Sequence, residues 1–256
     1  MCADSLKVER LSYQIKSRGS NPTSALQYLV KEIPKEQTYE WLLKKHYAHR
    51  IPSLTRALGL YNETLQGVLT FGMPPCHFNN GGGIFKDYSV NTLELTRLVI
   101  NDGLPANTAS FFISHSINLL EKPLCLVSFA DPNNGHHGYI YQATNWLYTG
   151  LSQKGGKDKQ WIYQNREYHG KTITIEWMKQ FFKKYDDKLN MKQNWILNGG
   201  IVEENEERKF RYIYFHGNKS EKQSMREHLA LPILPYPKGD NKRYDTSYSP
   251  PVQLTF

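Results

Sequence analysis

The sequence predicts an α/β fold in which a mixed central β-sheet is flanked by helices and followed by a basic, aromatic C-terminal extension. Residues Thr92–Ala130 contain a strand, a helix and a second strand in succession, and a β-α-β unit places its two strands parallel in one sheet. Upstream, Ser53–Tyr61 and Leu65–Phe71 are strand-like runs joined by Asn62-Glu63-Thr64, which indicates an antiparallel hairpin. A sheet that contains both kinds of pair is mixed.

The segments before the hairpin are predicted to be helical, after a polar start without clear periodicity. One helix is expected over Asn21–Lys31, which has a proline at its second position. A second is expected over Thr38–Tyr47, where Thr38 can cap the first turn. After the hairpin, Gly72–Tyr88 contains two adjacent prolines and three adjacent glycines, so a loop is predicted there.

Each part of the β-α-β unit has its own support. The strands are expected over Thr92–Ile100 and Leu124–Ala130, with a helix over Asn107–Leu120 between them. Apolar residues recur at helical spacing in the middle element, at Phe112, Ile113, Ile117 and Leu120. A second helix, Gly138–Tyr148, is predicted after the loop that follows the second strand.

The C-terminal half is predicted to contain short strands near residues 160–175 and 209–215, which flank a basic helix over Ile175–Lys188. The tail from Leu231 is rich in proline and tyrosine, so we expect it to run extended over the surface. The expected organisation is an N-terminal extension at 1–37, a catalytic domain at 38–230 and an extended tail at 231–256.

The charge of the chain favours a polyanionic partner. The formal net charge is +8 and the isoelectric point is about 9.2. Residues 1–150 contain 13 Lys and Arg against 11 Asp and Glu, whereas 151–256 contain 19 against 13. Aromatic residues are interleaved with this excess: Trp161, Tyr163, Trp177, Phe181, Phe182, Tyr185, Trp195, Tyr212, Tyr214 and Phe215. They either stack on nucleic-acid bases or form a core beneath solvated lysines.

Cysteine usage and hydropathy favour a soluble cytoplasmic protein with no membrane partner. The three cysteines are widely spaced, which is typical of a reducing compartment and gives no zinc-ligand pair. The sequence shows neither a signal peptide nor a run of about 18 apolar residues.

The start of the helix after Ile100 is a candidate anion site, because its first N–H groups have no partner within the helix. Asn107, Thr108 and Ser110 lie there. Arg97, on an otherwise apolar strand, pairs with Glu94 or another carboxylate, or else binds a phosphate or carboxylate of a ligand.

Asp131 directly follows a predicted strand, at an edge of the sheet where ligands commonly bind, and is a candidate base or metal ligand. An Asx turn or a helix cap explains it equally well. His136 and His46 together with a carboxylate are possible metal ligands, or histidines that form hydrogen bonds within a core.

Other residues of the same regions suit proton transfer. His46 and Tyr47 bring an imidazole and a phenol together near a helix end, although packing explains them too. The GxSxG, HExxH and DPPY-like motifs of familiar enzyme classes are missing from the sequence.

The order of the motifs resembles the Mom family of phage proteins. The first is His46-Tyr47-x-x-Arg50, followed by the end of the hairpin at Val68-x-x-Phe71-Gly72. The others are Leu93-Glu94-Leu95-Thr96-Arg97-Leu98, Val127-Ser128-Phe129-Ala130-Asp131-Pro132 and Gly135-His136-x-Gly138-x-Ile140-Tyr141-x-Ala143-x-Asn145-Trp146. The resemblance covers residues 40–150, and Arg211–Lys219 and Leu234–Pro237 extend it.

The resemblance implies a fold similar to the GNAT acyltransferases and an enzyme that modifies the adenine N6 amine of phage DNA, protecting it from host restriction. It also implies an acyl-CoA-type donor and iron, although the turn at Asn101–Ser110 lacks a glycine-rich pyrophosphate signature. Carried over by motif, the expected catalytic residues are Tyr47, Arg97, Asp131 and Tyr141. The expected metal ligands are His46 and His136, the donor-binding residues Arg97, Asn107, Thr108 and Ser110, and the DNA contacts Arg50, Asn145, Arg211 and Lys219.

The expected chemistry is transfer of a small acyl-derived, carbamoyl-type group to N6. Asp131 or His46 accepts the proton, one of Tyr141 and Tyr47 protonates the leaving group while the other stacks on the base, and Arg97 holds the donor. Two other functions remain open: N-acylation of tRNA or of a small amine, and nucleic-acid binding without catalysis.

Overall fold

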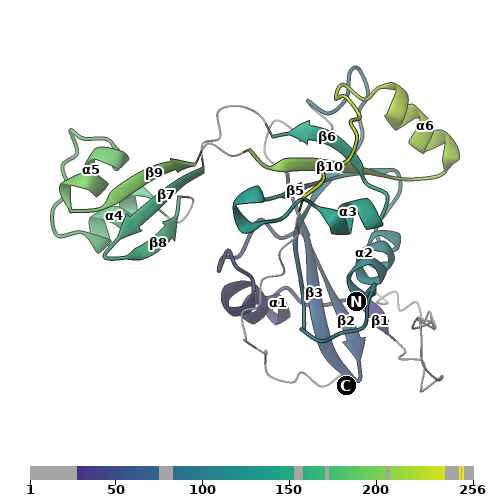
Figure 1. The fold of residues 1–256 in the computed structure, drawn as a ribbon, viewed down its shortest axis with the longest axis horizontal. Coiled ribbons are helices and arrows are strands. Elements are labelled where there is room, and N and C mark those ends of the chain that lie inside the picture. Colours follow the sequence, from purple (N-terminus) through teal and green to yellow (C-terminus); the bar gives the residue numbers. More distant parts are fainter. Residues whose placement is uncertain are drawn as a thin grey trace, which may run out of the picture. The chain divides into compact units, whose positions relative to one another are not determined.

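The computed structural model describes residues 28–74, 83–152, 158–170, 173–205, 208–239, 248 and 250 (Figure 1). The chain divides into two compact units, one comprising the residues up to Gly150 and from Phe210 onward, and the other comprising Leu151–Lys209. The predicted domain at 38–230 includes residues of both units. Strand β1 lies within the predicted N-terminal extension.

The first unit is built on a seven-stranded sheet in the order β1-β2-β3-β4-β5-β10-β6. The strands are β1 (Leu29–Glu32), β2 (Arg56–Asn62), β3 (Thr64–Gly72), β4 (Thr92–Ile100), β5 (Leu124–Ala130), β6 (Leu147–Leu151) and β10 (Phe210–His216). The β4–β5 pair is parallel, whereas β3 pairs antiparallel with β4 and β10 antiparallel with β5. The predicted mixed sheet is therefore confirmed.

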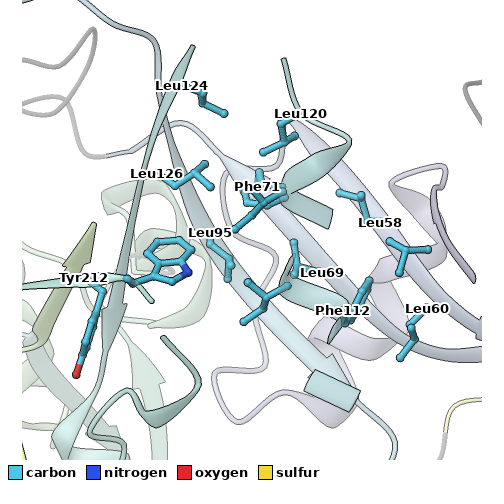
Figure 2. Close-up of a cluster of buried hydrophobic side chains, with 14 of the residues drawn as sticks. Leu58, Leu60, Leu69, Phe71, Leu95, Phe112, Leu120, Leu124, Leu126 and Tyr212 are labelled. Carbon is cyan, nitrogen blue, oxygen red and sulfur yellow. The ribbon is translucent and has the colours of Figure 1, made fainter. Parts of the chain in front are cut away.

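Helices cover both faces of this sheet. The helix α2 (Thr108–Asn118) contributes Phe112 and Ile113 to the largest buried cluster, which also contains Leu126 of β5 (Figure 2). The next residue of β5, Val127, belongs to a different cluster together with Met225 of α6 (Lys219–Glu227). Because successive side chains of a strand point to opposite faces, α2 and α6 lie on opposite sides of the sheet.

The helical segment α1 (Glu36–Glu40) and η1 (Trp41–Lys45) covers part of the second face. Trp41 and Leu42 are buried with Val68 and Val99 of the central strands. Residue His46, which follows η1, is thereby held against the middle of the sheet.

The second unit has a core of its own. Its antiparallel sheet has the order β8-β7-β9, formed by β7 (Asp158–Tyr163), β8 (Arg166–His169) and β9 (Ile201–Asn205). Two short helices, α4 (Ile175–Phe181) and α5 (Met191–Leu197), complete it. Its buried cluster consists of Trp161, Ile173, Met178, Phe182 and Trp195. Several aromatic residues of the basic C-terminal half are therefore core residues.

The predicted hairpin and the predicted β-α-β unit are confirmed. Residues 232–239 belong to no helix or strand, and the extended course of the tail stays a prediction. The prediction of a helix at Asn21–Lys31 is wrong where the structure describes it, because Leu29–Lys31 lie in β1 and pair with β2; residues 21–27 lie outside the described ranges.

Two helices are shorter than predicted. In place of Gly138–Tyr148, α3 comprises Tyr139–Ala143, because Asn145 takes a left-handed conformation at φ 60° and β6 begins two residues later. In place of Ile175–Lys188, α4 ends at Phe181, since Phe182 is extended.

Candidate active site

The two central parallel strands separate near their C-terminal ends. The β4–β5 pairing comprises Thr92–Glu94 against Cys125–Val127, although both strands continue beyond it. At the next position, Ser128 Oγ lies 2.8 Å from the carbonyl oxygen of Leu95. A side chain thus joins the strands where the ladder of backbone bonds ends, and polar groups gather around this separation.

A bulge in β4 orients Arg97. Thr70 is paired with Arg97 and Phe71 with Leu95, so Thr96 is an extra residue. Leu95 and Leu98 consequently contact the same core cluster, whereas Val99 belongs to the cluster beneath η1. Alternation then places Arg97 on the η1 side, where its Nη1 donates to the carbonyl of Thr96 at 2.6 Å.

A π-helical turn presents His46. The backbone N–H of His46 donates to the carbonyl of Trp41, five residues earlier, at 2.9 Å, and the chain then becomes extended. The imidazole is only 5% exposed. Its Nδ1 accepts a hydrogen bond from the backbone N–H of Ala48 at 3.0 Å.

The ring of Tyr47 contacts both histidines, His46 and His136. Its ring centroid lies 4.3 Å from that of His46 and 5.5 Å from that of His136, which it meets edge-on. His46 precedes β2 in the chain and His136 follows β5, so residues 90 positions apart meet at this ring.

A tight turn after β5 positions Asp131 and His136. The carbonyl of Asp131 accepts hydrogen bonds from the N–H groups of Asn134 and His136, each at 3.1 Å. Asp131 is buried, and its charge acts on the imidazole of His136. The turn ends at Gly138, where φ is +81° and a Cβ would lie 2.3 Å from the ring of Tyr212. Only glycine fits both conditions.

Tyr141 belongs to a hydrogen-bonded chain at the separation of the strands. Its hydroxyl lies 2.7 Å from Ser128 Oγ, which also contacts the Leu95 carbonyl. Ser128 has one hydroxyl proton and the carbonyl can only accept, so Ser128 donates to Leu95 and Tyr141 donates to Ser128. The ring of Tyr141 packs against Trp146 and Tyr212, with centroids 5.2 and 5.1 Å away.

Burial controls the protonation of these groups. It lowers the pKa of His46 well below 6.5, and the charges of Arg97 and His136 lower it further. Burial also lowers the pKa of His136, against an opposing effect of Asp131. The pKa of Tyr141 is raised chiefly by burial, and the nearby charge of Glu94 raises it further. At neutral pH the site therefore contains a neutral His46 and a protonated Tyr141.

The predicted residues Tyr47, Arg97, Asp131, Tyr141, His46 and His136 thus come together in the structure. Ring contacts join His46, Tyr47 and His136. Electrostatic effects connect Arg97 with both His46 and Tyr141, and Asp131 with His136. We call these six residues the strand-end site.

The C-terminal tail contacts the elements on both sides of the strand-end site. Next to α3, the Tyr236 hydroxyl donates to the carbonyl of Trp146 at 2.8 Å. On the η1 side, the buried Lys45 donates from Nζ to Asp102 Oδ2 at 2.7 Å and to the carbonyl of Tyr248 at 2.9 Å. The residue before His46 is thus fixed to a turn after β4 and to the tail.

The start of α2 is occupied by local hydrogen bonds. Asn107 is left-handed and makes no side-chain cap. Thr108 Oγ1 donates to the carbonyl of Pro105 at 2.7 Å, and Ser110 Oγ donates to that of Asn107 at 2.9 Å. These two hydroxyls therefore stabilise the turn that leads into α2.

The four expected DNA contacts lie in different environments. Arg50 is half-buried in the segment after η1, Asn145 is exposed after α3, and Lys219 is exposed at the start of α6. Arg211 is 6% exposed, and its guanidinium donates to Thr149 Oγ1 at 2.9 Å and to the Thr149 carbonyl at 2.7 Å. These bonds join β10 to β6, and the DNA contact expected of Arg211 stays a prediction.

Comparison with known sequences identifies the relatives of this chain. The sequence profile of the Mom protein family matches residues 27–238. The chain belongs to the Mom protein family. It is also similar to the methylcarbamoylase Mom of Escherichia phage Mu, at 28% identity over 134 residues, which cover 48% of this chain and 56% of that relative. The chain thus spans little more than half the length of the curated relative.

The Mom motifs contain two site residues to which sequence reasoning gave no chemical role. Ser128 hydrogen-bonds with Tyr141, and Glu94 contributes to the raised pKa of Tyr141. A serine within an apolar buried strand could have indicated Ser128, because a buried hydroxyl requires a partner. Glu94 was expected only as a partner for Arg97. Regular alternation would place these two residues on opposite faces of the strand, whereas the bulge at Thr96 places them on the same face.

The described residues include neither a three-ligand metal cluster nor a membrane-spanning helix. Among these residues, no three His, Cys, Asp or Glu side chains are arranged to hold one metal ion. The expected iron site at His46 and His136 stays a prediction, and we derive no step through iron. Within the same ranges, no helix is long and apolar enough to cross a membrane.

Proposed function

We propose that this protein modifies DNA by transferring a small acyl-derived, carbamoyl-type group to adenine N6, and that the modification protects phage DNA from restriction. The observation that carries the proposal is the assembly of the strand-end site in a chain of the Mom protein family. The name of the Mu relative, a methylcarbamoylase, supports the class of group transferred.

The separation of β4 and β5 supports a GNAT-like transferase. The backbone groups of β4 beyond Glu94 and of β5 beyond Val127 are not paired with each other. Strand edges of this kind can bind an extended donor by backbone hydrogen bonds. The positive charge of Arg97 is close enough to His46 and Tyr141 to affect both pKa values, which suits a donor phosphate or carboxylate at the same place. A bound acyl donor supplies the electrophilic carbonyl carbon.

Asp131 is the proposed base. Attack by N6 forms the N–C bond and gives the nitrogen a positive charge, so its proton becomes acidic. An ionised carboxylate is an acceptor at both oxygens and can take this proton. Collapse of the intermediate breaks the bond between the acyl carbon and the leaving group, to which the proton is finally delivered.

His46 is a proposed donor rather than a base. The neutral ring accepts from Ala48 at Nδ1, so its proton lies on Nε2. Nε2–H can then donate to the acyl oxygen, on which negative charge develops. This tautomer favours Asp131 over His46 as the proposed base.

The two tyrosines take different proposed roles. The ring of Tyr141 is packed between Trp146 and Tyr212, so its hydroxyl is the reactive part and relays the proton to the leaving group. Tyr47 is half-buried, and its ring is the part proposed to stack on the adenine. Adenine must leave the base pair to reach them, because N6 is otherwise engaged in Watson–Crick pairing.

The experiment is mass spectrometry of nucleosides from the DNA and the tRNA of cells that produce the protein, beside cells with an empty vector. The proposal predicts a heavier adenosine derivative in DNA alone. A derivative in tRNA alone would refute DNA as the substrate, and unmodified nucleosides in both pools would refute the proposed transferase function.

A further inference from the structure

The second unit carries a column of aromatic rings that runs from its core to its surface. Trp195 is fully buried and stacks on Trp177 with ring centroids 6.2 Å apart and planes 25° apart. Trp177 stacks in turn on Phe181, at 4.3 Å and 17°. Phe181 is 40% exposed, so the column ends at the solvent.

The other rings around Phe181 meet it at steep angles. The planes of Tyr163, Tyr168 and Phe182 make angles of 75°, 66° and 77° with it. None of these three is stacked in parallel on Phe181. The core of the unit is already formed by Trp161, Met178, Phe182 and Trp195, and Phe181 lies at its edge.

Cationic side chains border the exposed end of the column. Lys183 and Lys184 follow Phe181 by two and three residues, and both are exposed. The guanidinium of Arg166 lies 5.4 Å from the ring centroid of Tyr168, which contacts both Trp177 and Phe181. Four carboxylates lie within three residues of these positions in the sequence, namely Glu167, Glu176, Asp186 and Asp187, and Asp187 forms an ion pair with Lys179 at 2.6 Å.

We propose that this surface, formed by Arg166, Tyr168, Trp177, Phe181, Lys183 and Lys184, binds unpaired nucleotides of a DNA strand. A base continues the ring column at Phe181, and the cations contact the adjacent phosphates. Stacking tolerates every base because each has a π-face, and exposed lysines supply the attraction to the backbone. The DNA-modifying activity proposed above is the basis for choosing DNA as the occupant.

A second exposed apolar region on the same unit provides a matched control. Ile196 and Leu197 of α5 and Ile201 of β9 are each more than half exposed. They contain no aromatic ring. A purely hydrophobic attachment would use this region as readily as Phe181, whereas base stacking requires the ring.

The test is fluorescence anisotropy of a labelled single-stranded oligonucleotide, titrated with the full-length protein at several salt concentrations. Phe181→Ala is expected to weaken binding about tenfold, whereas Phe181→Tyr and Ile196→Ala retain the wild-type affinity. The double variant Lys183→Gln/Lys184→Gln is expected to reduce the slope of log K against log salt by about 1.4. Circular dichroism establishes that each variant is folded.

Wild-type affinity in Phe181→Ala, or an equal loss in Ile196→Ala, would overturn the inference. Nucleoside analysis separates this result from the proposed function. If Phe181→Ala weakens binding but wild-type protein leaves adenine unmodified, the nucleotide-binding surface is supported and the proposed transferase function is refuted. If adenine is modified and Phe181→Ala binds normally, the transferase function is supported and the nucleotide-binding surface is refuted.

Discussion

The backbone N–H of Ala48 donates to Nδ1 of His46 over 3.0 Å, and this contact fixes the tautomer of a buried imidazole. Because burial, Arg97 and His136 hold the pKa of His46 well below 6.5, the ring is neutral with its proton on Nε2. The π-helical turn Trp41–Lys45 precedes this geometry, and the chain becomes extended at His46. The chemistry proposed for the strand-end site depends on that proton.

Substitution of His46 tests whether Nε2 is a donor. His46→Ala is expected to lower the single-turnover rate of adduct formation by about 100-fold, the effect of losing one donor to a developing oxyanion. His46→Gln places an amide N–H near Nε2 and should retain more of the rate than His46→Asn. A rate in His46→Asn equal to or above that in His46→Gln would contradict the donor role.

The same pKa shift predicts how stability depends on pH. An unfolded histidine takes up a proton near pH 6.5, whereas folded His46 does so only at lower pH. The unfolded state therefore binds more protons below pH 6.5, and the contribution of His46 to the free energy of unfolding is lost as the pH falls from 6.5 through the folded pKa. Urea titrations at pH 7 and pH 5 should show a smaller loss in His46→Gln than in wild type. An equal loss would contradict the prediction.

The chain from Tyr141 through Ser128 predicts coupled variants. Ser128→Ala removes the acceptor for the Tyr141 hydroxyl, and we expect it to lower the rate about tenfold, which corresponds to the loss of roughly one hydrogen bond. Combined with Tyr141→Phe, it should add little further loss, because both changes break one interaction. Additive losses in the double variant, measured by single-turnover kinetics, would show that the residues act independently.

Lys45 is expected to affect rate more than stability. Its buried ammonium fixes the turn before His46 to Asp102 and to the tail. Lys45→Met keeps the volume and removes the cost of burying a charge, so the free energy of unfolding should change by less than about 1 kcal/mol. The loosened turn should lower the rate of adduct formation severalfold. A variant with wild-type kinetics would show that the tail does not position His46.

Gly138 and Gly103 form a matched pair for the turn before α3. Both have positive φ, +81° and +73°, but a Cβ at Gly138 would meet the Tyr212 ring at 2.3 Å, whereas one at Gly103 meets no atom within 4 Å. Gly103→Ala should cost about 1 kcal/mol and Gly138→Ala at least about 3 kcal/mol of unfolding free energy in urea titrations. Equal costs would contradict the steric argument.

The elements that could be predicted from sequence are those with long apolar patterns. Strand β4 begins and ends at the predicted residues, and α2 differs from its prediction by a residue or two at each end. The bulge at Thr96 could not be predicted from the sequence, since it depends on the pairing of β4 with β3. The π-helical turn could not be predicted either, because it depends on the packing of Trp41 and Leu42. The separate core of the second unit was also missed, because lysines between its aromatic residues conceal the helical period. The order of the motifs was enough to predict the six residues of the strand-end site. The burial of Arg211 could not be predicted, because it depends on the pairing of β10 with β6.

The measurement that tests the central claim most directly is the adenosine adduct content of DNA from cells producing wild type, Asp131→Asn or Asp87→Asn. Asp87 is an exposed carboxylate of the same unit, so its variant controls for charge. We predict an adduct in wild type and Asp87→Asn that is lost in folded Asp131→Asn. Equal adduct levels in all three would contradict the assignment of the chemistry to the strand-end site.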